Sequence, residues 1–332
     1  MKLRSILAGT SLLLAAVPAF AQIKVNDMLT FTGWATGSYQ YTSPSPGASF
    51  DSLNLDAALF SAIITPTKGV TATVSGYYRP SNEGGVSPGG GEFTILDAYV
   101  SYDAGNGVTL SAGKFLSNLG YESFYNISDN MISLANQAFL APIPGYHEGF
   151  KLDYAVDKTT TVGFQIVDSL FPKPGYNATE GDGELKHNAG AEAYYTYTGI
   201  DGLTLWAGIG WDSAGNFEAH DVVVYDVWAA YAINKTNNIA VEEIYKDGGL
   251  IGTKGSNWLV YYQLISSDKF STWFCVSGED VSDGPSYSKY SVSPTYALTA
   301  NLSVRAQYSY TSYHDFAWKS ANFVGAEVMF KF

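Results

Sequence analysis

The chain has 332 residues, of which 46% are hydrophobic and 15% charged, and its formal net charge is −13. So many apolar and aromatic side chains exclude a disordered chain, and the scarcity of charged helix formers excludes a coiled coil. One Cys excludes a disulfide scaffold. The acidic balance argues against a nucleic-acid partner, since phosphate recognition needs a basic surface.

Residues 1–21 carry the three parts of a secretory signal peptide. Lys2 and Arg4 form a positive start, an apolar stretch follows, and Ala19-Phe20-Ala21 is a small-x-small cleavage site. We therefore expect residues 1–21 to be cleaved and residues 22–332 to form a single exported domain. No later run of roughly 18 apolar residues follows, so any membrane insertion must use β-strands.

The remaining chain alternates between apolar and polar residues in short segments separated by Gly, Asn, Asp, Ser and Pro. The segment GLTLWAGIGW at 202–211 is typical, because Leu203, Leu205 and Ile209 fall on one face and Thr204 and Trp206 on the other. In chain order the pattern predicts strands at 28–40, 51–64, 69–78, 93–102, 107–115, 146–156, 158–168, 184–198, 202–211, 219–233, 236–246, 255–266, 269–279, 286–298, 300–312 and 320–332.

The connections between these strands alternate in length. Short ones follow the even-numbered strands, and longer ones follow the odd-numbered strands, among them 41–50, 79–92, 116–145 and 169–183. Outer-membrane barrels typically have all their long loops at one end. The alternative fold, a secreted β-sandwich, has no physical reason to place its long loops in this way. The sequence thus predicts an all-β fold: a transmembrane antiparallel up-and-down β-barrel of about 16 strands, with short periplasmic turns and long extracellular loops.

A barrel of about 16 strands is wide enough to leave an aqueous channel. The longest connection, 116–145, is too long for a plain connector, and it is our candidate constriction loop. Residues 129–140 are expected to form a short helix with Ser128 as N-cap. This segment could narrow the bore, cover the mouth as a lid, or pack on the rim. Candidate constriction residues in and beside it are Glu122, Tyr125, Asp129, Asn130, Asn136 and His147.

A specific motif occupies residues 113–154. It consists of Gly113-Lys114-Phe115, Gly120, Pro142, Pro144, His147, Gly149, Lys151, Leu152 and Tyr154. This pattern resembles the OmpL-like putative beta-barrel porin family, and the likeness in length and hairpin layout extends over residues 22–332. The resemblance implies a porin in the outer membrane of a Gram-negative cell.

If the apolar faces meet lipid, the opposite faces line the lumen, because a charge at mid-depth in lipid costs about 2–4 kcal/mol. The pore-lining candidates are Asp56, Arg79, Asp97, Lys151, Asp153, Glu192, Asp226, Lys289, Arg305 and Glu327. Alternation does not assign the phase of Glu242-Glu243. Lys114 falls on the apolar parity, so it lies either at the strand's outer end or beside a bulge. A mixed lumen suits small hydrophilic solutes, and the acidic connections predict a weak cation preference.

Residues 85–89 (GVSPG) match the G-x-S-x-G motif of hydrolases around Ser87, but they lie in a Gly-rich connection rather than on a strand-to-helix turn. The four His are dispersed, so we expect no metal, no cofactor and no enzyme activity. A lipase-like hydrolase and an adhesive or structural barrel without conductance are the alternatives. Expected partners are small hydrophilic solutes, outer-membrane lipid and lipopolysaccharide, the assembly machinery through the C-terminal Phe332, and two further copies in a homotrimer, by analogy with 16-stranded porins.

Overall fold

The computed structural model describes residues 22–79, 92–122, 130–135, 139–141, 143–171, 189–213, 220–248 and 254–332, apart from the side chains of Arg79 and Glu92. The expected signal peptide at 1–21 and the motif around Ser87 lie outside these residues. No helix in the described segments is long and apolar enough to cross a membrane.

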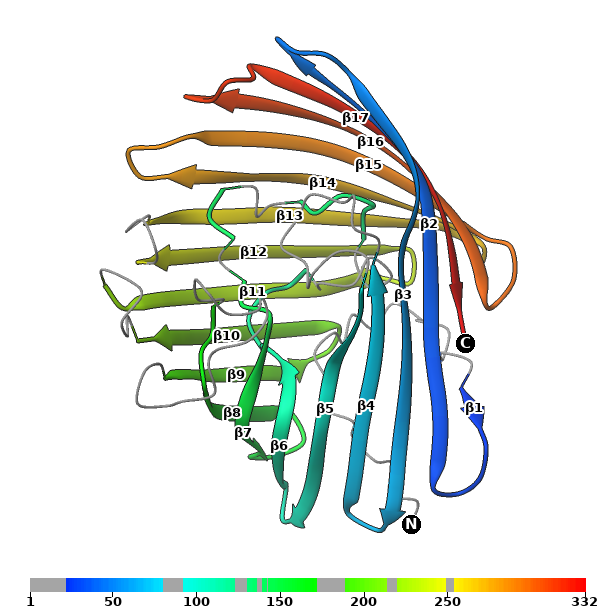
Figure 1. The fold of residues 1–332 in the computed structure, drawn as a ribbon, viewed down its shortest axis with the longest axis vertical. Helices are drawn as coiled ribbons and strands as arrows, with labels where there is room; N and C mark the ends of the chain where they lie inside the picture. Colours follow the sequence, from blue (N-terminus) through cyan, green and yellow to red (C-terminus); the bar gives the residue numbers. More distant parts are fainter. Residues whose placement is uncertain are drawn as a thin grey trace.

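The described residues form a single antiparallel sheet that closes on itself (Figure 1). Its strands are β1 (Ile23–Lys24), β2 (Leu29–Ser45), β3 (Phe50–Thr67), β4 (Val70–Arg79), β5 (Glu92–Gly105), β6 (Val108–Leu116), β7 (Tyr146–Ala155), β8 (Thr160–Val167), β9 (Gly190–Ile200), β10 (Leu203–Asp212), β11 (Val222–Asn234), β12 (Asn237–Asp247), β13 (Lys254–Ser267), β14 (Phe270–Val281), β15 (Ser286–Ala297), β16 (Leu302–His314) and β17 (Ser320–Lys331). Each strand pairs with the next, and β17 pairs with β2 to close the ring. The predicted 16-stranded barrel is confirmed by β2–β17, and the two-residue β1 pairs beside β2.

The strand boundaries follow the predicted ones closely, with one clear difference. A loop was expected at 41–50, but β2 and β3 stay paired as far as Thr42 and Phe50, which shortens this connection to 46–49. The turns at the other end are tight, as in 106–107, where Asn106 and Gly107 both have positive φ (53° and 82°). Two positive φ values suit a two-residue hairpin turn, whose twist matches that of the flanking strands.

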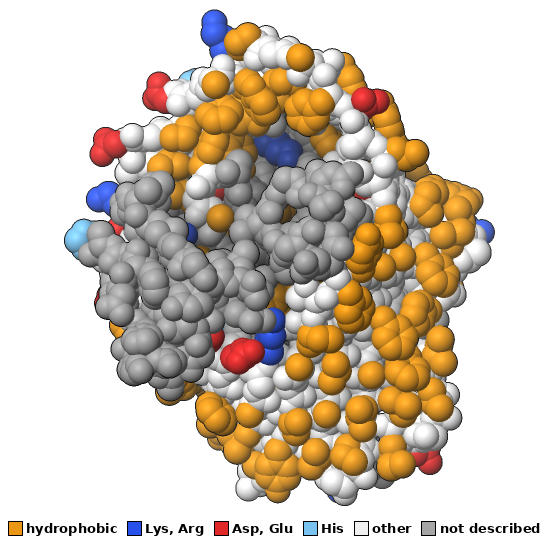
Figure 2. All heavy atoms as spheres, in the orientation of Figure 1, with side chains coloured by type: hydrophobic (Ala, Val, Ile, Leu, Met, Phe, Trp, Pro, Cys, Tyr) orange, Lys and Arg blue, Asp and Glu red, His pale blue; other side chains and the backbone are white. Residues whose placement is uncertain are grey.

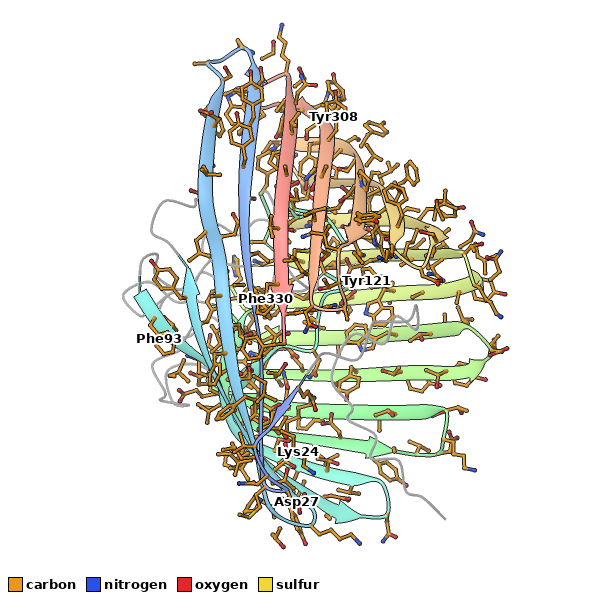
Figure 3. All side chains as sticks on the ribbon, turned by 90° about the vertical axis from the view of Figure 1, so that its right-hand side faces the viewer. Lys24, Asp27, Phe93, Tyr121, Tyr308 and Phe330 are labelled. Carbon is orange, nitrogen blue, oxygen red and sulfur yellow. The ribbon has the colours of Figure 1, made fainter. Side chains whose placement is uncertain are left out.

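The outer face of the barrel is apolar. Leu53, Phe93 and Phe150 expose 82%, 68% and 73% of their surface, and they point away from the interior. Hydrophobic side chains cover the face formed by β2–β5 (Figure 2), and Figure 3 shows Phe93 and Tyr308 projecting outward. Because this face would be insoluble in water, it indicates a lipid-facing wall.

The opposite parity points into the barrel and settles the phase at Glu242-Glu243. Glu242 faces inward and is buried, whereas Glu243 is exposed on the outer face. Lys114 pairs with Ala98 and Glu148 two residues from the end of β6 and is 6% exposed, and the nearest register shift lies between Ile95 and Asp97 of β5. A register shift in β3 does occur beside Asp56, which turns this carboxylate inward.

Candidate functional site

The connection at 117–145, which joins β6 to β7, lies against the inner wall wherever it is described. The backbone N–H of Asn118 donates to Glu192 Oε2 (2.9 Å), and that of Gly120 donates to Asp226 Oδ2 (2.7 Å). The backbone N–H of Tyr121 donates to the carboxylate of Glu242. The acceptors stand on β9, β11 and β12, so the chain crosses the wall perpendicular to the strands.

The later part of the same connection is held by the strands near the barrel's closure. Gln307 Oε1 on β16 accepts the backbone N–H groups of Ile132 (2.5 Å) and Ser133 (3.0 Å). Glu279 on β14 accepts those of Phe139 (2.7 Å) and Leu140 (3.2 Å). These contacts join residues more than 130 positions apart, and together they fasten the connection to both sides of the barrel.

Glu122 fastens the connection to itself and to the wall. Its carboxylate accepts the backbone N–H of Ala135 (2.8 Å) and the hydroxyl of Tyr261. On β15, Lys289 Nζ donates to Ser133 Oγ (2.8 Å) and to the carbonyl of Leu134 (2.6 Å). The connection is therefore held at its backbone donors and at its backbone acceptors.

These contacts correct the expected helix at 129–140. Its described residues, 130–135 and 139–140, form bends and irregular backbone and no helical turn. A helix needs each N–H to donate to a carbonyl four residues earlier, but here the N–H groups of Ile132, Ser133 and Ala135 donate to side chains instead. The acceptor of Ala135 is the Glu122 carboxylate, and a hydrogen bond to a charged acceptor is stronger than a neutral one, which favours the bent conformation there.

Apolar contacts between the connection and the inner wall add to these hydrogen bonds. A Cβ on Gly208 or Gly210 of β10 would lie 2.9 or 2.8 Å from the Leu119 methyl groups, so these glycines leave the space that Leu119 fills. Tyr121 lies inside the barrel (Figure 3) and packs edge-on against Trp228, with ring centroids 5.5 Å apart. Burial raises the pKa of the Tyr121 phenol, so the phenol stays neutral beside the wall carboxylates.

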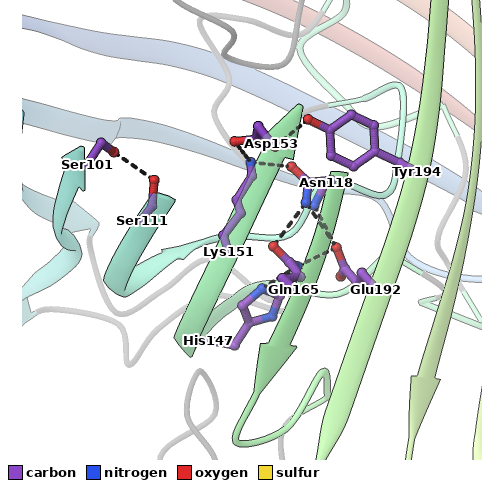
Figure 4. Close-up of polar contacts among 9 residues, drawn as sticks. All are labelled: Ser101, Ser111, Asn118, His147, Lys151, Asp153, Gln165, Glu192 and Tyr194. Carbon is purple, nitrogen blue, oxygen red and sulfur yellow. Dashed lines mark hydrogen bonds and ion pairs between the residues drawn. The ribbon is translucent and has the colours of Figure 1, made fainter. Parts of the chain in front are cut away.

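A second polar network lies on β7–β9 (Figure 4). Lys151 Nζ donates to Asn118 Oδ1 (2.7 Å) and lies 3.6 Å from Asp153 Oδ2. Asn118 Nδ2 donates in turn to Gln165 Oε1 (3.0 Å), and Gln165 Nε2 donates to Glu192 Oε2 (2.5 Å). The network ties the first residues of the connection to the same stretch of wall.

Among the predicted pore-lining residues, nine of the described side chains face the interior: Asp56, Asp97, Lys151, Asp153, Glu192, Asp226, Lys289, Arg305 and Glu327. Arg79 belongs to β4, and its side chain lies outside the described part. Glu122 and Asn130 belong to the connection, while Tyr125, Asp129 and Asn136 lie outside the described residues. His147 stands on β7 and is fully buried, with Nε2 2.9 Å from Gln165 Nε2.

Sequence reasoning placed Gln307 in the lumen but missed other inward residues that hold the connection. Glu279 falls on the polar parity of its predicted strand, so alternation could have found it. Glu242 could not be assigned, because Glu243 beside it gives both faces of β12 an acidic residue.

A closed barrel of sixteen described antiparallel strands, with an apolar outer face, a polar inner face and a connection held against the inner wall, has the architecture of an outer-membrane porin. The model of the family described as "Putative beta-barrel porin-2, OmpL-like" matches residues 28–332, and the chain belongs to this family. The resemblance drawn from the motif at 113–154 is thereby confirmed.

Solved structures show the same fold. The outer membrane channel DcaP of Acinetobacter baumannii is 11% identical, with a TM-score of 0.68 over 92% of this chain and 97% of its own. The anion-selective porin from Comamonas acidovorans is 10% identical (TM-score 0.63; 92% and 99%). The trimer form of OmpT of Vibrio cholerae is 14% identical (TM-score 0.62; 92% and 100%). Comparison with curated proteins gives no match.

Proposed function

We propose that this protein is an outer-membrane channel for passive diffusion of small hydrophilic solutes and ions, and not an enzyme. The observation that carries the proposal is the connection at 117–145, whose backbone N–H groups donate to Glu192, Asp226 and Glu279 on the inner wall. A segment anchored across the bore narrows the channel without moving with the solute. The family and the fold of this protein are those of channel-forming barrels.

In this proposal the 117–145 connection is the constriction loop, and those inward residues of β5, β7 and β9 that the connection leaves uncovered face the passing solute. A weak cation preference is part of the proposal. It is supported by the formal net charge of −13 and by exposed acidic residues such as Asp280, Asp283 and Asp315 beside the long connections.

The proposed surroundings follow from the outer face. Its exposed apolar side chains suit outer-membrane lipid and lipopolysaccharide, and the strand-ending aromatic Phe332 suits recognition by the assembly machinery. A homotrimer is proposed as well, supported by the trimer form recorded for one similar fold.

The test is planar-bilayer recording with the refolded protein. We expect stepwise, ohmic single-channel currents and uptake of small sugars into liposomes. The absence of channels in a correctly folded preparation would overturn the proposal. A lipase assay on wild type and Ser87→Ala tests the hydrolase alternative in parallel, and activity that depends on Ser87 would favour it.

A further inference from the structure

Five aromatic side chains form a cluster at the end of the barrel that carries the long connections. This rim cluster consists of Phe139, Tyr287, Tyr313, Phe316 and Trp318. The ring of Phe316 lies at its centre, with its centroid 5.1 Å from that of Phe139, 5.2 Å from that of Tyr313 and 5.8 Å from that of Trp318. Tyr313 in turn lies 6.0 Å from Tyr287 and 6.1 Å from Trp318. The rings therefore hold one another in place.

The rim cluster lies on the bore side of the wall. Tyr287 and Tyr313 face each other across β15 and β16. Tyr287 is buried, and its hydroxyl donates to a backbone carbonyl of the 117–145 connection at 3.3 Å. Phe139 belongs to that connection, which lies against the inner wall. Because Phe316 packs against Phe139 and Tyr313, the lipid on the outer face does not cover it.

Part of the rim cluster stays in contact with water. Phe316 is 42% exposed, and Tyr313 and Trp318 are partly exposed beside it. Most other exposed aromatic side chains of the described residues stand on the outer wall, where lipid replaces water. A group of apolar rings that is partly open to water and away from lipid indicates a surface that binds another molecule.

Polar groups border the exposed rings. His314, Asp315 and Lys319 are exposed, and they flank Phe316 and Trp318 in the chain. The backbone of this connection is fixed, because Lys319 accepts a backbone N–H from β16 at 3.0 Å and donates its own to β2 at 2.6 Å. A pyranose ring carries C–H groups on its face and hydroxyls around its edge. An apolar platform with hydrogen-bonding groups at its border matches both.

We propose that the rim cluster is a saccharide-binding site, in which Phe316 and Trp318 stack on the C–H face of a pyranose ring and the neighbouring polar side chains bind its hydroxyls. This inference rests on the proposed function and names sugars as the solutes that the channel gathers at its entrance. A neutral sugar is not attracted by the acidic net charge, so ring contacts supply the attraction. The rings are held by one another before a sugar arrives, which lowers the entropic cost of binding.

The experiment records single-channel currents with cellotetraose, a chain of four pyranose rings, on both sides of the bilayer. We expect brief interruptions of the current that become more frequent with concentration. Sorbitol, a polyol without a ring, should cause none. Phe316→Leu and Trp318→Leu keep an apolar side chain but remove the aromatic face, and we expect each to weaken cellotetraose binding roughly twofold to tenfold. Trp318→Phe keeps an aromatic face and should retain most of the binding.

The matched control is Phe150→Leu, which removes a ring that is 73% exposed on the outer face of β7 and should bind cellotetraose like wild type. The inference is overturned if cellotetraose does not interrupt conducting wild-type channels, or if sorbitol interrupts them equally. It is also overturned if Trp318→Leu binds like wild type, or if Trp318→Phe loses as much binding as Trp318→Leu, since the aromatic face then plays no part. If wild type forms no channels in salt alone, the proposed function itself has failed.

Discussion

At the scale of single residues, buried charge in this barrel is tolerated because partners are fixed by the register of neighbouring strands. Arg305 and Glu327 face each other directly across β16 and β17, and the guanidinium donates from Nε at 2.9 Å as well as from its terminal nitrogen. The energetic cost of removing such a pair from water is offset only while both members are present.

A double-mutant cycle tests how the Arg305–Glu327 pair contributes to stability. We expect each single variant, Arg305→Met or Glu327→Met, to destabilise the barrel by about 3–5 kcal/mol, since it leaves the other member charged and buried without its partner in the pair. The double variant Arg305→Met, Glu327→Met should be closer to wild type, because no uncompensated charge remains. The measurement is urea unfolding of the barrel in lipid vesicles, followed by Trp fluorescence. Additive effects of the two single substitutions would contradict this account.

At the scale of the element, the 117–145 connection shows how a long loop is ordered without regular secondary structure. Its backbone N–H groups donate to wall side chains, and Leu119 fills the space above Gly208 and Gly210. Ile132 takes the corresponding place near Gly325, where a Cβ would lie 2.9 Å from its terminal methyl. Polar and apolar anchors thus alternate along the loop.

Weakening two anchors tests this arrangement. We expect Asp226→Asn combined with Glu279→Gln to loosen the connection, because an amide oxygen is a weaker acceptor for N–H than a carboxylate. Single-channel conductance and current noise should both rise, by a factor of roughly two or less if most anchors persist. Faster cleavage of the loop by an added protease would report the same loosening.

The matched control for this double variant is Asp268→Asn, which removes a carboxylate from an exposed turn. It should leave conductance, noise and proteolysis at wild-type values. If the double variant behaves like this control, the wall carboxylates do not hold the connection.

At the scale of the whole molecule, Phe332 adds to the seam between β17 and β2 that closes the ring. Phe332 exchanges two backbone hydrogen bonds with Gly33, at 2.8 and 2.9 Å, and its ring lies 6.3 Å from that of Phe60. Gly33 leaves room for this ring, because a Cβ there would lie 2.8 Å from Phe332. Closing the ring removes the last unpaired strand edges, which neither lipid nor solvent could satisfy within a membrane.

Phe332→Ala should therefore slow or reduce barrel formation. We expect a loss of about 1–3 kcal/mol from the missing ring contacts, together with a lower folded yield. Folded and unfolded barrels are separated by their gel mobility with and without heating. Phe150→Ala, which removes a ring that is 73% exposed on the outer face of β7, is the control and should fold at the wild-type rate. Equal yields for both variants would count against a role for Phe332 in closure.

Alternation by itself predicted the number and order of the strands, and the inward face of most of them, with β12 as the exception. Lipid contacts apolar side chains and water contacts polar ones. Apolar and polar residues therefore alternate along each strand with a period of two, as in 202–211. The same rule assigned Glu192, Asp226 and Lys151 to the interior, because a local period needs no knowledge of distant residues.

Only the tertiary structure decided what those inward residues do. Glu192 meets Asn118 across 74 positions and Gln307 meets Ser133 across 174, and such pairs come together only once the barrel has closed. Gln307 and Glu279 accept N–H groups of the segment 129–140 in place of the expected helix, since local propensity cannot register an acceptor on a distant strand. The barrel wall can therefore be predicted from the sequence, because its alternating pattern is local. The arrangement inside the bore depends on contacts that form only when the barrel closes.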